Sequence, residues 1–251
     1  MPRFFIEVAY KGTAYAGFQV QQNANTVQAE IEKALSTYYR QDFSLTGSSR
    51  TDAGVHARQN YFHFDAAIDP AGANKAVYHL NAILPADIVV KQIVPVKDGA
   101  HCRFDALSRR YAYTIYSDKD PFMEGMGFYY PYDLDLELLN EGARQILAAT
   151  DFESFAKRNS QVHTFNCSIH ESEWEREGKQ LVYYVRGNRF LRGMVRGLVG
   201  TMLKLGRGKL TPNEFSAIIE AKDPTKADFS MPAHGLTLLG VSYPEGFLGG
   251  L

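Results

Sequence analysis

The sequence predicts an α+β fold made of two similar lobes, and three observations lead to this prediction. Short segments of alternating apolar residues, which are typical of strands, recur along the chain. Segments with apolar residues at helical spacing lie between them. Both halves of the chain run in the order strand, helix and further strands. We expect one lobe over residues 1–100 and a second over residues 101–251, with the boundary at Lys97–Arg103.

In the first lobe, Arg3–Tyr10 alternates and is rich in Phe, Ile and Val, which predicts a strand, and a loop is expected over Lys11–Gly17. Asn25 and Gln28 resemble a capping box, so a helix is expected to begin there. The remaining expected elements are a strand, a helix and a strand: Asn60–Asp65, Gly72–Leu84 and Ile88–Val96.

In the second lobe, Tyr111, Tyr113 and Ile115 alternate in a strand expected over Arg109–Tyr116. The other expected strands cover Ser168–Arg176, Leu181–Gly187 and Leu238–Tyr243. Three helices are expected, over Leu136–Ala149, Arg189–Leu205 and Pro212–Ala221.

The helix expected over Arg189–Leu205 has two unusual features. Gly193, Gly197 and Gly200 share one face, which predicts the close approach of another backbone or of a ligand. Arg192 and Arg196 lie at the edge of the apolar stripe, where a guanidinium can be partly buried and still reach a carboxylate. A plain amphipathic helix with arginines extending to water is the alternative.

The composition is that of an ordinary globular protein. Of 251 residues, 45% are hydrophobic and 22% charged, which argues against intrinsic disorder. No apolar run reaches the roughly 18–20 residues of a membrane span, and the N-terminal residues lack the apolar segment of a secretion signal. The two cysteines are too few for a disulfide framework. We therefore expect a soluble, cytoplasmic protein.

The charge is neutral overall but unevenly distributed. The net charge is −1, yet Gly178–Asn213 carries eight basic residues and no acidic one. Such a cluster is typical of a surface that binds a polyanion such as RNA. A solvated basic face paired with acidic loops elsewhere is equally compatible with it.

The histidines and cysteines give no metal-binding pattern. His56 and His63 lie seven residues apart, as do His163 and His170, and neither pair has the spacing of a helical metal clamp. We therefore expect packing or surface roles for these residues, and no metal.

The segment Gly47–Ala57 is the most site-like part of the sequence. It combines small residues and two glycines with Arg50 and Asp52, and it contains no lysine to neutralise the aspartate. A carboxylate in such a loop can act as a nucleophile, a general base or a metal ligand. It can equally be a turn residue that caps backbone N–H groups.

Residues 49–57 read SRTDAGVHA and closely resemble GRTDAGVHA, the active-site signature of the TruA family of tRNA pseudouridine synthases. Other segments resemble the remaining family motifs, in the family's order: Tyr10–Tyr15 with Gly17–Gln19, Thr26–Gln28, Ser108–Tyr113, Phe190–Leu191 with Met194–Arg196 and Val199–Gly200, and Ala233–Leu236. On this resemblance the chain is identified as a member of that family. Ser49, Phe18 and Gly197 depart from the usual glycine, tryptophan and asparagine, which concerns loop shape and RNA contacts rather than the reaction.

The resemblance implies a reaction and the residues that perform it. Pseudouridine formation breaks the N1–C1′ bond of uridine, turns the base and rejoins it through C5, without metal or cofactor. The essential aspartate matches Asp52, which either adds covalently to the substrate or removes a proton from the sugar. Arg196 would pair with Asp52, and Tyr111 would pack on the target base and could accept the C5 proton.

The resemblance also implies the fold and the partners. The family has two α+β lobes of mixed or antiparallel sheet, with helices on one face and a central RNA-binding cleft, and works as a homodimer. Its substrates are uridines near positions 38 to 40 of the tRNA anticodon stem-loop. Arg50 would lie near the extruded nucleotide, and the other candidate RNA contacts are Arg110, Arg189 and Arg192.

Three alternatives stay open at this point. The enzyme could modify other RNA positions, or the chain could be a catalytically silent RNA-binding protein of the same fold. The third alternative is a nucleoside hydrolase, which would be expected to show an aspartate cluster near the N-terminus. This chain has no aspartate before Asp42.

Overall fold

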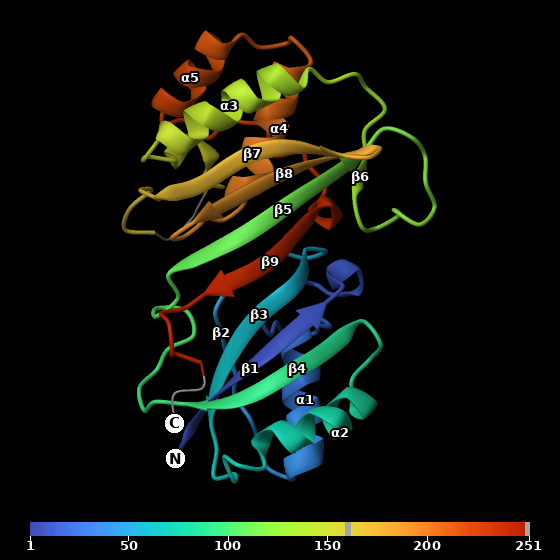
Figure 1. The fold of residues 1–251 in the computed structure, drawn as a ribbon, viewed down its shortest axis with the longest axis vertical. Helices are drawn as coiled ribbons and strands as arrows, with labels where there is room; N and C mark the ends of the chain where they lie inside the picture. Colours follow the sequence, from blue (N-terminus) through green and yellow to red (C-terminus); the bar gives the residue numbers. More distant parts are fainter. Residues whose placement is uncertain (159–161, 249–251) are drawn as a thin grey trace. The chain divides into compact units, whose positions relative to one another are not determined.

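The computed structural model describes residues 1–158 and 162–248 and forms two compact units. The first unit comprises Met1–Ser108 and Leu238–Leu251, and the second comprises Arg109–Thr237. These units differ from the expected lobes, because the first continues to Ser108 and takes up the end of the chain as well. Five α-helices and nine strands occur among the described residues, in agreement with the predicted α+β class (Figure 1).

The first unit is built around a central strand with an antiparallel neighbour on each side. Strand β1 (Arg3–Tyr10) pairs with β3 (His56–Asp65) and with β4 (Ile88–Val96). The short strand β2 (Thr46–Gly47) pairs with β3, and β9 (Leu236–Ser242) contributes its last residues to this unit. Strand β3 begins four residues earlier than the expected Asn60, directly after the loop that carries Asp52.

Helices α1 (Val27–Tyr39) and α2 (Ala76–Ile83) belong to the same unit (Figure 1). Even-numbered residues of β1 form the apolar layer on the helix side. Phe4 stacks on Phe64 with 5.6 Å between ring centroids, and Phe43, just beyond α1, contacts the edge of Phe64. This layer forms the core of the unit, because burial of large apolar side chains is the main stabilising contribution to folding.

The capping box expected at Asn25 is wrong. The N-cap of α1 is Thr26, whose side-chain oxygen accepts a hydrogen bond from the N–H of Ala29. Gln28 does not reach back to the cap, because its amide donates to the carbonyl of Leu45 instead. The sequence therefore located the helix correctly, but its cap lies one residue later.

The second unit repeats the same layer arrangement. Strand β8 (Gln180–Gly187) lies between β5 (Ser108–Tyr116) and β7 (Ile169–Glu177), antiparallel to both, and β6 (Phe128–Tyr129) runs parallel to β5. Its helices are α3 (Leu136–Ala148), α4 (Met194–Gly206) and α5 (Pro212–Glu220). The buried side chains of Tyr183 and Trp174 pack together, and Trp174 donates from Nε1 to the sulfur of Met202 on α4.

The basic helix begins later than the sequence predicts. Helix α4 starts at Met194, not at Arg189, because Gly193 adopts a left-handed conformation with φ of +73°. The close approach expected on its glycine face is confirmed. A Cβ on Gly200 would overlap the carbonyl oxygen of Asp228, and a Cβ on Gly197 would lie 2.9 Å from the ring of Phe229. The segment of residues 228–229 therefore packs directly on the glycines.

Four 3₁₀ turns complete the described structure: Gly12–Ala14, Ala73–Lys75, Glu153–Phe155 and Ala233–Gly235. No helix within the described ranges is long and apolar enough to cross a membrane.

Candidate active site

The loop that carries Asp52 connects β2 to β3 in the first unit. The N–H of Val55 donates to the carbonyl of Asp52 over 3.1 Å, which closes a tight turn. Gly54 lies inside this turn with φ of +80°, a conformation that favours glycine. The turn presents the Asp52 side chain, which is half-buried, directly before the first residue pairs of β3.

A buried amide holds the first half of the loop. Asn60 is fully buried on β3, and its Nδ2 donates to the carbonyl of Ser49 and to the hydroxyl of Tyr10, each over 3.1 Å. Its Oδ1 accepts from the hydroxyl of Ser48 over 2.7 Å. Tyr10 in turn hydrogen-bonds the hydroxyl of Thr51 over 2.8 Å. Asn60 therefore ties Ser48 and Ser49 of the loop directly to the sheet, and Thr51 through Tyr10.

The segment after β1 supports the second half of the loop. The N–H of Gly12 donates to Nδ1 of His56, and a Cβ on Gly12 would overlap the carbonyl oxygen of Val55. The N–H of Phe18 donates to the carbonyl of Thr51 over 3.1 Å. Only a residue without a side chain fits at position 12, so this motif glycine has a packing role.

Phe18, which replaces the family's usual tryptophan, is a core residue. Its ring stacks on Phe62 with 4.5 Å between centroids and fills the space above Gly47, where a Cβ would overlap it. The departure therefore affects packing beneath the loop and leaves the polar groups of the loop in place.

The carboxylate of Asp52 is not used for local capping. Among the described residues of its unit, no backbone N–H donates to it and no cation pairs with it. A turn residue that serves only to cap would make such a bond. The neighbouring Arg50 is exposed and has no carboxylate partner among the described residues of the first unit.

Ser49, which replaces the family's usual glycine, introduces an energetic cost. Its hydroxyl is buried and has no hydrogen-bond partner among the described residues. An orphaned buried hydroxyl destabilises a fold by about 1–3 kcal/mol.

Tyr111 and Arg196 both belong to the second unit. The half-buried Tyr111 lies on β5, and its ring meets Phe190 edge to face with 5.2 Å between centroids. Arg196 lies in the first turn of α4 and donates from Nε to the carbonyl of Met231 over 2.6 Å. The pairing of Arg196 with Asp52 stays a prediction.

Tyr113 and Arg196 bind the same segment of the second unit, and sequence reasoning missed this role of Tyr113. Its hydroxyl donates to the carbonyl of Pro232 over 2.9 Å. Burial raises the pKa of the Tyr113 phenol, and the charge of nearby Arg196 opposes that rise. Both side chains therefore hold the segment of residues 231–232 by its carbonyls. The alternation of β5 marked Tyr113 as inward-facing, but nothing local indicated its partner.

Arg110 is engaged within its own unit. Its guanidinium makes a bidentate contact with Glu171, with distances between 2.6 and 3.0 Å, and lies 4.6 Å from the ring centroid of Tyr184. Its expected role in RNA binding stays a prediction, and any RNA phosphate must compete there with Glu171.

Some basic residues of the segment Gly178–Asn213 form ion pairs with carboxylates and others do not. Three of its eight cations have carboxylate partners: Lys179 with Asp118, Arg186 with Glu171, and Lys204 with Asp228. Arg207 lies over the ring of Tyr132 at 4.0 Å. Among the described residues of the second unit, no carboxylate pairs with Arg189, Arg192, Arg196 or Lys209. Arg189 and Arg192 precede α4 and Arg196 lies in its first turn, so three of these four cations gather around the start of that helix, while Lys209 follows its end.

The sequence spacing did not indicate one cluster of potential metal ligands. Ligand atoms of His63, His101 and Cys102 lie within 4.8 Å of one another at the far end of β3. Burial lowers the pKa of His63 to about 4. Nδ1 of His101 accepts the backbone N–H of Arg103, and the thiol of Cys102 donates to the carbonyl of Thr46. These groups thus have protein partners, and we assign no metal to them.

The similarity to known proteins extends over nearly the whole chain. A model of the family described as tRNA pseudouridine synthase matches residues 6–105 and 143–244. A tRNA pseudouridine synthase A of Porphyromonas gingivalis is 46% identical over 248 residues, which cover 98% of both chains. The corresponding protein of Parabacteroides distasonis is 44% identical and covers 98% of this chain and 97% of its own. That of Staphylococcus carnosus is 39% identical, with coverage of 94% and 89%.

Proposed function

Because the chain belongs to the tRNA pseudouridine synthase family, an isomerase family, we propose that Asp52 is its catalytic residue and that its substrates are uridines 38 to 40 of the tRNA anticodon stem-loop. The observation that supports Asp52 is the state of its carboxylate. The main chain of Asp52 makes the turn, while its side chain makes no local cap among the described residues. An active-site carboxylate held on a fixed loop and free of structural duties is available for reaction.

The reaction transfers the base from one atom of the same nucleotide to another. The N1–C1′ bond breaks, the uracil turns, and a C5–C1′ bond forms while the C5 proton is lost and N1 gains a proton. Asp52 serves this sequence either by adding covalently to the substrate or by removing a proton from the sugar. Both routes require an ionised carboxylate, which a paired Arg196 would favour.

Two residues of the second unit complete the proposed site. Tyr111 packs against the target base and accepts the C5 proton late in the reaction. Arg196 keeps Asp52 charged and oriented, using the guanidinium nitrogens that remain after Nε has bonded Met231.

The substrate is a large polyanion, and the unpaired cations are the proposed contacts to it. Arg50 lies two residues from Asp52 and supports the nucleotide that must leave its stack. Arg189 and Arg192 contact phosphates. The lack of carboxylate partners for these two residues within their unit supports this role. We also propose a homodimer, active in the cytoplasm.

Tritium release from C5-labelled uridine tests the proposal. The protein should release tritium from tRNA, and release should be lost when positions 38 to 40 carry no uridine. Release from other positions would place the enzyme elsewhere in RNA, and release from no tRNA would leave a silent RNA-binding protein.

The variant Asp52→Asn separates a catalytic from a structural role. The amide keeps the shape of the side chain, so folding and tRNA binding should persist, whereas tritium release should fall below detection. Activity within tenfold of the parent protein would exclude Asp52 as the catalytic group.

A further inference from the structure

We infer that Arg58 and Lys91, placed side by side by two neighbouring β-bulges, bind backbone phosphates of the tRNA beside the Asp52 loop. This inference rests on the proposed function, since it takes tRNA as the ligand. It adds a second RNA contact to the first unit, on two residues outside the motifs of the family.

The first bulge lies in β3. Val8 pairs with Asn60 and Tyr10 pairs with Ala57, so two residues of β3, Arg58 and Gln59, stand opposite one residue of β1. Because Asn60 and Ala57 share the face of their partners, both residues between them point to the other face of the sheet. We call this other face the Glu7 face, after the β1 residue at its centre.

The second bulge lies in β4, on the opposite side of β1. Glu7 pairs with Gln92 and Val8 with Val90, so Lys91 is the extra residue. Its ammonium group donates to the carbonyl of Arg58 over 2.7 Å, which joins the two bulges directly. Bulges concentrate beside active sites, where they redirect side chains.

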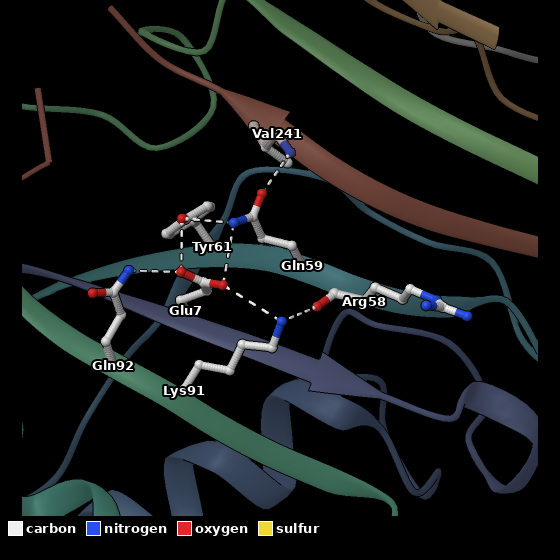
Figure 2. Close-up of polar contacts among 7 residues, drawn as sticks. All are labelled: Glu7, Arg58, Gln59, Tyr61, Lys91, Gln92 and Val241. Atoms are coloured by element: carbon white, nitrogen blue, oxygen red, sulfur yellow. Dashed lines mark hydrogen bonds and ion pairs between the residues drawn. The ribbon is translucent and has the colours of Figure 1, made fainter. Parts of the chain in front are cut away.

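A buried carboxylate fixes the position of Lys91. Glu7 is buried, and it accepts hydrogen bonds from the hydroxyl of Tyr61 at 2.8 Å, from Gln92 at 2.7 Å and from Gln59 at 3.1 Å (Figure 2). The ammonium group of Lys91 lies 3.7 Å from the same carboxylate. With this many donors the Glu7 charge is satisfied locally, so the network is a rigid support rather than a free anion.

The network leaves one positive charge in excess. Glu7 is the one carboxylate among these residues and Lys91 and Arg58 are the two cations, while Gln59 accepts the N–H of Val241 with its own oxygen. Figure 2 shows the Arg58 guanidinium extended away from Glu7, which is the one acidic residue drawn there. Arg58 is exposed and has no carboxylate partner among the described residues of the first unit, and the side chain of Lys91 is 44% exposed.

The short stretch of chain between Asp52 and Arg58 favours RNA as the ligand of Arg58. The turn that spans Asp52 and Val55 covers less than about 7 Å. The three residues from Val55 to Arg58 add at most about 10 Å. A strand of RNA that delivers a base to Asp52 therefore carries phosphates within reach of Arg58, whose planar guanidinium suits them.

The experiment measures how tRNA affinity depends on salt. Arg58→Gln removes one charge from the Glu7 face. Lys33→Gln is the matched control, because Lys33 is exposed on α1 and has no carboxylate partner among the described residues. Log affinity falls linearly with log salt, and each lost phosphate contact reduces the steepness of this fall by about 1. The affinity gap between Arg58→Gln and the parent should therefore shrink about threefold between 50 and 200 mM salt.

Three results decide the matter. Arg58→Gln should flatten the slope, Arg58→Lys should retain it, and Lys33→Gln should behave as the parent protein. Equal slopes for both Gln variants would overturn the inference, and so would a changed sedimentation coefficient of Arg58→Gln with an unchanged slope, because this face would then bind a second copy. Tritium release by the parent is measured separately, so a failed function with an intact slope effect, or the reverse, can be told apart.

Discussion

Replacing Asn60 with leucine tests whether the sheet positions the Asp52 loop. Leucine fills the volume but removes the hydrogen bonds to the Ser49 carbonyl, the Tyr10 hydroxyl and the Ser48 hydroxyl, together with a bond from the N–H of the adjacent Tyr61. A buried hydrogen bond contributes about 0.5–1.5 kcal/mol net. The free energy of unfolding should therefore fall by about 3 kcal/mol, which for a chain of this length lowers Tm by roughly 6–12 °C.

The effect on the reaction should exceed the effect on stability. The lost bonds release the loop on the side that precedes Asp52, and a displacement of about 1 Å at a reacting group costs about a hundredfold in rate. We expect the single-turnover rate of tritium release at saturating tRNA to fall about a hundredfold, at a temperature where circular dichroism shows the variant folded. Affinity for tRNA should change little.

Ile146→Ala provides the matched control. Ile146 is fully buried in α3 of the second unit, so its truncation costs about 2–5 kcal/mol without touching the loop. If Asn60→Leu and Ile146→Ala lose stability equally and also retain equal rates, Asn60 is an ordinary core residue and the positioning argument is refuted.

Three further substitutions test individual side chains. Arg196→Met should lower the single-turnover rate at saturation ten- to a hundredfold, because a charge-assisted pair contributes roughly 1.5–3 kcal/mol; a loss of affinity alone would reduce Arg196 to a phosphate contact. Gly197→Asn should destabilise the protein by about 1–3 kcal/mol through overlap with Phe229, and Phe229→Ala in the same chain should recover part of that loss in thermal melts. Ser49→Ala should raise stability by about 1–2 kcal/mol by removing an orphaned hydroxyl, and an unchanged Tm would show that the hydroxyl is satisfied.

Local elements could be predicted from the sequence because their signals are local. The periodicity that predicted helices over Leu136–Ala149 and Pro212–Ala221 gives both starts correctly and both ends to within one residue. The start of α4 was wrong by five residues, because periodicity does not register the left-handed Gly193. The glycine face of α4 correctly indicated a close approach, but it could not indicate which segment approaches.

The candidate site divides in the same way. Asp52 stands out in a distinctive motif, whereas Asn60 has no local mark and becomes important only because β3 lies beside the loop. Arg58 and Lys91 have none either, since a bulge is a property of two paired strands and not of one segment. Sequence patterns therefore identify candidate reacting groups more readily than the residues that hold them in position.

The division of the chain into units has a consequence for its synthesis. The first unit includes Leu238–Leu251, and the N–H of Val241 reaches back to Gln59. A ribosome therefore delivers the second unit complete before the last strand of the first. Contacts between such distant residues form late, because closing a long loop must come before they stabilise anything. We expect a chain cut before residue 238 to retain a protease-resistant second unit, whereas the unit that carries Asp52 stays incomplete.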